Sequence, residues 1–180
     1  LCLFSLDRVE EARKAAKAFR KAHKKSGLWL SRFNVAEGKH AMRSGNYKRA
    51  KSRFEDVLAA SSEESIQSEA EYYLTRVLGK EGKREDHLKA LLAFVKQRPD
   101  SEHWAEAALE LAELYEADAD YAAASKFYRE AIERGVPDED RPGVLARLVT
   151  VHRNLRLFDT AIAYARRLVE EFPRDSRATR

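Results

Sequence analysis

The chain has 180 residues, of which 36% are charged and 44% belong to the hydrophobic set. This composition is too apolar for a disordered chain and too charged for a membrane protein, and it favours helix because Gly and Pro number only 7 and 4. Residues 1–53 hold 15 Lys and Arg against 4 Asp and Glu, whereas residues 54–180 hold 19 against 26. The formal net charge of +4 therefore hides a basic N-terminal third and an acidic remainder.

The chain begins at Leu1 rather than at a methionine, which indicates a fragment, a processed product or the ordered part of a longer protein. Its first residues are apolar but too few for the complete apolar core of a signal peptide, so they are either the tail of one or the end of a buried helix, and we favour the buried helix. The single cysteine, Cys2, excludes an internal disulfide and says little about the compartment.

Residues 1–30 are predicted to form a partial first repeat that contains one basic amphipathic helix. An apolar stripe at helical spacing precedes an equivalent stripe by 38 residues and consists of Val9, Ala12, Ala16 and Phe19. The basic patch of the same helix consists of Arg13, Lys14, Lys17, Lys21 and Lys24, and its four lysines share one face.

This basic patch has several interpretations. It is either a solvated face or a surface that meets an acidic protein, including the chain's own acidic C-terminal part in an intramolecular or head-to-tail contact. A peripheral contact with an anionic membrane surface is a further alternative. Nucleic acid is disfavoured as a partner, because no aromatic or glycine-rich element accompanies the charge.

A repeat of 37 residues organises the rest of the chain. Tyr47, Arg84, Tyr121 and Phe158 are spaced by 37 residues each time. The same period recurs three, seven and ten positions later, in Ala50, His87, Ala124 and Ala161, then Phe54, Leu91, Tyr128 and Ala165, then Val57, Phe94, Ala131 and Leu168. We therefore expect four repeats over residues 31–180.

Each repeat is predicted to be a pair of antiparallel helices. In the third repeat an apolar stripe from Ala105 to Tyr115 precedes a polar turn and a second stripe from Tyr121 to Ile132. In the fourth, stripes at 145–152 and 158–169 flank a turn. We expect prolines to end the second helices, at Pro137 and Pro173, because proline cannot continue a helix.

Neighbouring hairpins should share a core, since one hairpin alone buries too little apolar surface. Tyr47, Tyr121 and Phe158 are therefore expected to point inward, and His87 and His152 to be packed and hydrogen-bonded. We expect two further residues, Trp29 and Trp104, to be wedges between repeats. The predicted fold is all-α: an α–α superhelix, or solenoid, of about four and a half helical hairpins.

The third repeat resembles the tetratricopeptide repeat closely, through residues 105–115 and 120–124. The first repeat matches through Gly45-Asn46-Tyr47, Ala50 and Phe54, whereas the second departs from the family with Arg84 in place of an aromatic. The resemblance implies a non-catalytic scaffold without a cofactor or small-molecule substrate, whose first helices line a groove for a protein partner.

The family's groove positions carry over to this sequence residue by residue. They are Arg32, Lys39 and Arg43, then Tyr72, Arg76 and Lys80, then Glu106, Glu110 and Glu113, then Arg147, Arg153 and Asn154. These positions are basic in the first repeat, basic with one aromatic residue in the second, acidic in the third and basic in the fourth. This order favours an extended peptide of mixed charge or a helix as the partner, and the alternative is an ordinary solvated face.

The link Pro99-Asp100-Ser101, followed by Ala105, is similar to that of bacterial envelope repeat proteins, of the outer-membrane-assembly lipoprotein and Tol–Pal-associated kinds. This resemblance favours a complex in the periplasm or cell envelope over the cytoplasm. The superhelical region of soluble lytic transglycosylases is also similar, so a helical accessory domain of a larger enzyme is an alternative. Neither a metal-binding arrangement of histidines nor a catalytic motif is present in the sequence.

Overall fold

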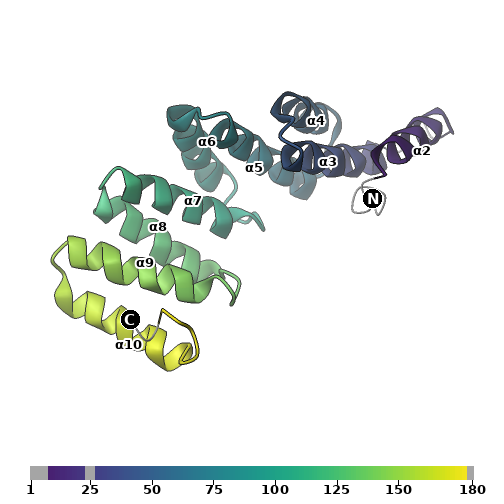
Figure 1. Cartoon of the computed structure of the whole chain (residues 1–180). Coiled ribbons are helices and arrows are strands. Elements are labelled where there is room, and N and C mark those ends of the chain that lie inside the picture. Colours follow the sequence, from purple (N-terminus) through teal and green to yellow (C-terminus); the bar gives the residue numbers. More distant parts are fainter. Residues whose placement is uncertain (1–7, 23–26, 178–180) are drawn as a thin grey trace. The chain divides into compact units, whose positions relative to one another are not determined.

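The computed structural model describes residues 8–22 and 27–177, and every regular element in these residues is an α-helix (Figure 1). The helices are α2 (Val9–Ala22), α3 (Gly27–Arg43), α4 (Tyr47–Ala60), α5 (Glu64–Lys80), α6 (Arg84–Gln97), α7 (Trp104–Ala117), α8 (Tyr121–Arg134), α9 (Arg141–Asn154) and α10 (Phe158–Glu171). The all-α prediction is therefore confirmed. None of these helices is long and apolar enough to cross a membrane.

The second helix of each repeat begins at a residue that carries the 37-residue period. These helices, α4, α6, α8 and α10, begin at Tyr47, Arg84, Tyr121 and Phe158 and have 14 residues each. Side-chain caps fix two of these starts, because Asn46 accepts a hydrogen bond from the Arg49 amide and Asp120 accepts one from the Ala123 amide.

The turns inside the four hairpins share one backbone geometry with the same period. Gly45, Gly82, Ala119 and Arg156 all have positive φ, at 73°, 75°, 59° and 59°. In each turn the next residue donates its amide to the carbonyl five positions earlier, as Asn46 does to Ala41 at 2.8 Å and Asp120 to Tyr115 at 2.9 Å. The backbone conformation therefore repeats with the same period as the side chains, although only two of the four turn positions carry glycine.

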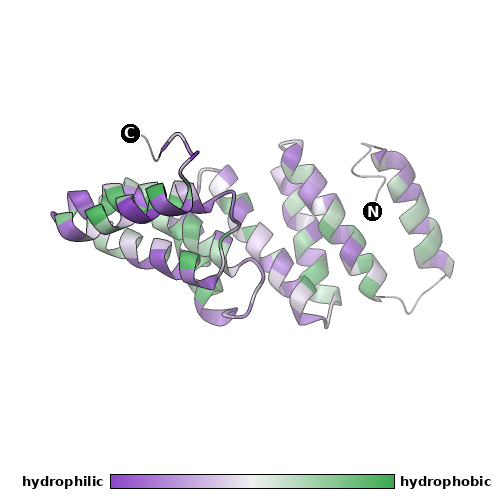
Figure 2. Cartoon of the chain, turned by 90° about the horizontal axis from the view of Figure 1, so that it is seen from below, coloured by the Kyte–Doolittle hydropathy of each residue, from purple (hydrophilic) through white to green (hydrophobic). Residues whose placement is uncertain are grey.

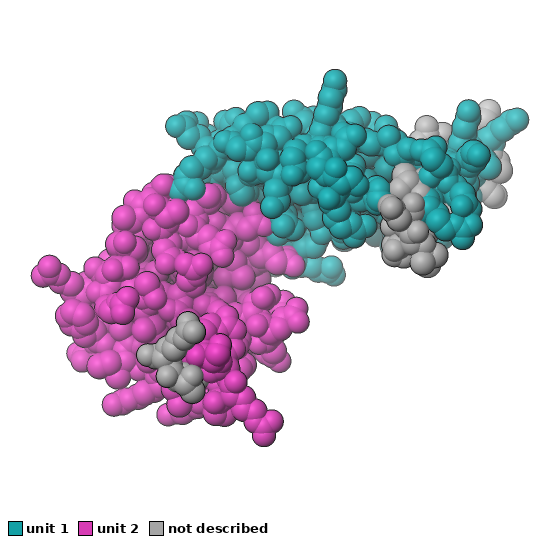
Figure 3. All heavy atoms as spheres, viewed as in Figure 1, with its two compact units in different colours: residues 1–90, 100–103 teal, residues 91–99, 104–180 magenta. Residues whose placement is uncertain are grey.

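The chain divides into two compact units (Figure 3). Unit 1 comprises residues 1–90 and 100–103, and unit 2 comprises residues 91–99 and 104–180. Helix α6 is divided between them, whereas the hairpins α3–α4, α7–α8 and α9–α10 each lie within one unit. The expected boundary between residues 30 and 31 stays a prediction.

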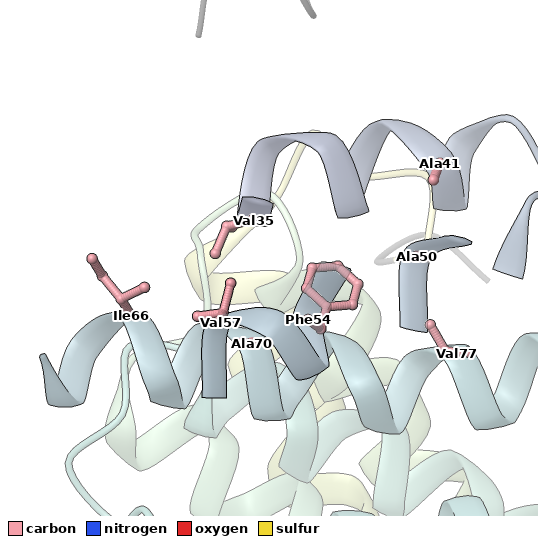
Figure 4. Close-up of a cluster of buried hydrophobic side chains, with 8 residues drawn as sticks. All are labelled: Val35, Ala41, Ala50, Phe54, Val57, Ile66, Ala70 and Val77. Atoms are coloured by element: carbon pink, nitrogen blue, oxygen red, sulfur yellow. The ribbon is translucent and has the colours of Figure 1, made fainter. Parts of the chain in front are cut away.

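The core of unit 1 is built by three helices around Phe54 and Val57 of α4, both fully buried. Figure 4 shows the Phe54 ring between α3, which carries Val35 and Ala41, and α5, which carries Ala70. Gly38 of α3 lies directly over this ring, since a Cβ there would stand 2.6 Å from Phe54 Cε1. The second helix is therefore covered from both sides by first helices, as expected for a shared core.

In unit 2, α8 packs between α7 and α9, and α9 packs against α10. Leu111, Tyr128, Leu145 and Leu148 are fully buried there. Trp104 is buried as well, and its indole Nε1 donates to the Val95 carbonyl at 2.9 Å while the Arg134 guanidinium lies 3.9 Å from its ring centroid. The expected packing role of Trp104 is thus confirmed.

Three local predictions are wrong. Helix α8 ends at Arg134 because Gly135 takes a left-handed conformation with φ 102°, so glycine stops this helix ahead of Pro137. Trp29 and Phe158, which were expected to be packed, are each 58% exposed. Both lie on helices at the ends of the described repeats, where the shared core is incomplete.

The turn geometry predicts that Ala119→Gly stabilises the protein by about 1 kcal/mol, since glycine adopts positive φ without the strain that alanine carries. The matched control is Ala122→Gly on the exposed face of α8, where loss of helix propensity should cost about 1 kcal/mol. Urea unfolding followed by circular dichroism measures both. Destabilisation of both variants would contradict the left-handed turn at Ala119.

Candidate functional site

Two first helices of unit 1, α3 and α5, bring predicted groove residues together. Lys39 of α3 donates to Glu69 of α5 at 3.0 Å, and its ammonium lies 4.8 Å from the centroid of the Tyr73 ring. Burial alone would lower the pKa of Lys39, but the interactions with Glu69 and Tyr73 outweigh it and raise the pKa above its usual value. Lys39 therefore stays charged on a face that joins two repeats.

The other predicted residues of this face differ in exposure. Arg43 and Lys80 are exposed at the ends of α3 and α5, and exposed Arg32 lies 3.8 Å from Glu63. Tyr72 is buried instead: its ring stacks on His103 at 4.7 Å between centroids, and the Arg76 guanidinium lies 5.8 Å from it. Tyr72 therefore supports the face from beneath and has almost no surface to offer a partner.

In unit 2 the corresponding face is formed by α7 and α9. The carboxylates of Glu106, Glu110 and Glu113 follow one another along α7, with Glu116 one turn further. Glu116 accepts a hydrogen bond from the Tyr128 hydroxyl at 2.7 Å and lies 3.4 Å from the Arg147 guanidinium of α9. Arg153 and Asn154 are exposed at the end of α9.

The carboxylates of α7 repel one another. Partial burial raises the pKa of Glu113 above its usual value, and the charges of Glu110 and Glu116 raise it further against the opposing effect of Arg147. The pKa of the Tyr128 phenol is raised as well, by burial and by its hydrogen bond to Glu116. A cation placed on this face would relieve the repulsion, so the face is suited to basic groups of a partner.

A buried carboxylate surrounded by arginines was not predicted. Glu37 of α3 is only 3% exposed and accepts hydrogen bonds from Arg13 Nε at 2.9 Å and Arg49 Nε at 3.0 Å, with Arg53 at 3.8 Å. Burial would raise the pKa of Glu37, but the hydrogen bonds and positive charges outweigh it and lower the pKa. The sequence feature that could have indicated this cluster is Glu37 itself, a single acidic residue inside a strongly basic segment.

This cluster changes the interpretation of the predicted basic patch. Arg13 is turned toward Glu37 and also pairs with Glu10, so it joins α2 to α3 and contributes little to an outer surface. Lys14, Lys17 and Lys21 are exposed on α2. Lys24 lies outside the described residues.

The two core histidines are packed as predicted. The ring of His152 contacts the Ser125 hydroxyl through Nε2 at 3.2 Å and the Leu148 carbonyl through Nδ1 at 2.8 Å. His87 is buried against Gly79, where a Cβ would stand 2.7 Å from the imidazole. Among the described residues, no group of three or more His, Cys, Asp or Glu is placed to hold a metal ion.

An apolar groove lies between α2 and α3 in unit 1. Its volume is about 250 Å³, and it is lined by Ala12, Ala15, Ala16, Phe19, Trp29, Leu30 and Phe33. Phe19 and Trp29 form its rim, with ring centroids 6.0 Å apart. Figure 2 shows hydrophobic residues on both helices where they adjoin.

Comparison with known proteins gives a family and a set of structural neighbours. A family model described as a tetratricopeptide repeat-like domain matches residues 5–153. No curated protein matches the sequence.

Solved structures of repeat proteins are similar to the whole chain. The structure of MamA has a TM-score of 0.63 at 16% identity, with 94% of each chain covered. That of PilF from Pseudomonas aeruginosa has a TM-score of 0.71 at 15% identity, covering 98% of this chain and 75% of that one. YrrB, described as a TPR protein with an unusual peptide-binding site, has a TM-score of 0.61 at 19% identity, covering 97% and 84%. These likenesses confirm the predicted α–α superhelix class of fold.

The Glu37 cluster predicts that Glu37→Gln destabilises the protein by about 3 kcal/mol, because three arginines lose their buried partner. Since the folded-state pKa lies below the usual 4.5, the contribution of Glu37 is present above that pH and is lost as pH falls below it. Urea unfolding between pH 7 and the acid range should therefore show a shallower acid loss in the variant. Glu63→Gln, in the exposed pair with Arg32, is the control and should change stability by no more than about 0.5 kcal/mol.

Proposed function

The chain belongs to the tetratricopeptide repeat-like domain family, and from this we propose that it is a non-catalytic scaffold that binds a segment of a partner protein along its first helices. The observation that carries the proposal is the charge of the first-helix faces. In each unit, side chains from two successive first helices meet on one face, and the faces have opposite character: α3 and α5 offer mainly cations, whereas α7 offers a row of carboxylates.

The face of unit 1 suits an acidic stretch of the partner. Arg32, Arg43 and Lys80 are exposed, and the Lys39–Tyr73 contact adds a cation beside an aromatic ring. An acidic side chain of the partner would be stabilised by several cations at once, and an apolar side chain of the partner would pack against the half-buried ring of Tyr73. This combination favours an extended or helical segment with acidic and apolar residues.

The face of unit 2 suits a basic stretch. Glu106, Glu110 and Glu113 line α7, and burial together with the charges of Glu110 and Glu116 raises the pKa of the Glu113 carboxyl. Arg147 of α9 lies 3.4 Å from Glu116 at the end of this acidic row, and Arg153 is exposed at the end of α9. A partner with an acidic part and a basic part would therefore match both units in charge.

We place this scaffold in a bacterial envelope complex. The support is the resemblance of the Pro99-Asp100-Ser101 link to envelope repeat proteins and the fold likeness to PilW, which is described as a type IV pilus biogenesis factor. PilW has a TM-score of 0.65 at 14% identity, covering 98% of this chain and 76% of that one.

Charge reversal on the face of unit 1 tests the binding proposal. Peptides selected from a displayed random library with the wild-type chain should be acidic and apolar. The variant Arg32→Glu, Arg43→Glu and Lys80→Glu should bind them at least about tenfold more weakly, the equivalent of about 1.4 kcal/mol, in fluorescence anisotropy.

The matched control carries the same change of charge on second helices, at the exposed residues Lys48, Lys51 and Lys89. It should keep most of the affinity, and binding by the wild type should weaken as salt is raised. Equal loss in both variants, or failure of the wild type to select any peptide, would refute binding on this face.

A further inference from the structure

The outer face of α2 carries positive charge that the described residues do not compensate. Between Glu11 and Glu37 the sequence has eight Lys and Arg residues and no acidic residue. Three of these cations, Lys14, Lys17 and Lys21, are exposed on one face of the helix, and none of them pairs with a carboxylate of the described residues. The acidic residues of the same helix, by contrast, pair with arginines. We call these three residues the lysine face.

The repeat itself leaves the lysine face open. Its counterparts 38 residues later are Ser52, Glu55 and Ala59 of α4, and all three are exposed. They are exposed although α4 is packed between α3 and α5. The exposure of the lysine face is therefore a property of its position in the repeat and does not depend on which helix precedes α2.

Leu28 adds an apolar side chain at the same end of the hairpin. It lies in the first turn of α3 and is 44% exposed. The Phe19 and Trp29 rings, 6.0 Å apart, show that this turn lies beside the last turns of α2. The counterparts of Leu28 in the next two repeats, Ser65 and Glu102, are exposed as well, but they are polar. Leu28 is therefore an apolar residue at a position that the repeat gives to solvent.

We propose that the lysine face and Leu28 bind the surface of an anionic lipid membrane. The lysines would meet the lipid phosphates, and Leu28 would enter the boundary between headgroups and acyl chains. This binding is separate from the proposed binding of a partner protein by the first helices, and neither requires the other.

The kind of cation favours a lipid surface over a folded acidic partner or a nucleic acid. A lysine is a point charge on a flexible stem, whereas an arginine offers a planar fork that recognises carboxylates and phosphates in fixed geometry. The fork of Arg13 is already bound by Glu37, and the exposed cations beside it are lysines. Mobile headgroups can rearrange around such point charges, and they also accept the side chain of Leu28, which has no ring to stack on a base.

The spacing of the lysines lets all three act together. Lys21 lies in the last turn of α2, and the rise of about 1.5 Å per residue places Lys17 and Lys14 roughly 6 Å and roughly 10 Å back along the axis. These distances are within the Debye length of about 10 Å at 0.1 M salt. Each lysine held near an anionic membrane should strengthen binding by a factor of about five.

Sedimentation with lipid vesicles tests the proposal. The wild-type chain should bind phosphatidylglycerol vesicles, should not bind phosphatidylcholine vesicles, and should bind more weakly as salt is raised. The variant Lys14→Glu, Lys17→Glu and Lys21→Glu should bind phosphatidylglycerol at least about thirtyfold more weakly. The matched control, Lys48→Glu, Lys51→Glu and Lys89→Glu, has the same net charge on other exposed positions and should keep most of the affinity. Circular dichroism checks that both variants stay helical.

A second measurement tests the part assigned to Leu28. Its neighbour Trp29 is 58% exposed, so its fluorescence should shift to shorter wavelength on phosphatidylglycerol vesicles. Trp29→Phe should lose this shift and still bind, because Trp104 is buried and its emission should not change. Leu28→Ser should weaken binding about tenfold, whereas Leu157→Ser, at a similarly exposed leucine of unit 2, should not.

Four outcomes would overturn the proposal. A wild-type chain that does not bind phosphatidylglycerol would show that the lysine face is only solvated. Equal loss in the two triple variants would show that net charge, rather than this face, is responsible. Tighter binding to a DNA duplex, lost in the same variant, would assign the face to nucleic acid. Vesicle binding that is unchanged in Leu28→Ser and leaves the Trp29 emission unshifted would show that Leu28 does not enter the membrane.

Discussion

The structure depends on one packing constraint: the apolar face of a second helix is fully buried only where first helices pack on it from two sides. Phe54 shows how close that packing is, because α3 approaches its ring at Gly38 and leaves no room for a Cβ. In the same cluster, Val57 is fully buried between α3 and α5. A hairpin alone has no such cover, so its stability comes from its neighbours, and the ends of a run of hairpins are its least satisfied parts.

The same constraint decides which charges hold the chain together and which are available to a partner. Glu37 lies where α2, α3 and α4 meet, and its carboxylate is surrounded by arginines because a buried charge needs compensation. Lys39, two residues later, lies at the outer face and pairs with Glu69 of the following first helix. Charges between hairpin layers are therefore structural, and charges on the first-helix faces join repeats while they remain accessible.

The fold could be predicted from the sequence because the period is carried by side chains of one kind at fixed spacing, such as Ala50, Ala124 and Ala161. The turns were harder to predict. Ala119 and Arg156 adopt the same left-handed conformation as Gly45, although residues with a Cβ disfavour it. The hydrogen bonds that end the preceding helix impose this conformation. For the candidate site, the family's positions predict which residues belong to the faces but not how exposed each side chain is. Tyr72 is buried because His103 stacks on it from the link after α6, a contact between residues distant in sequence.

The exposure of Trp29 and Phe158 follows from the repeat itself rather than from any peculiarity of these residues. Ile66, the counterpart of Trp29 in the next repeat, is buried, and Tyr121, the counterpart of Phe158 in the preceding repeat, is half-buried. Repeats that share a core leave apolar side chains exposed wherever the described helices offer no neighbour. The exposed fraction of an apolar side chain in this fold is therefore set by which helices pack against its position.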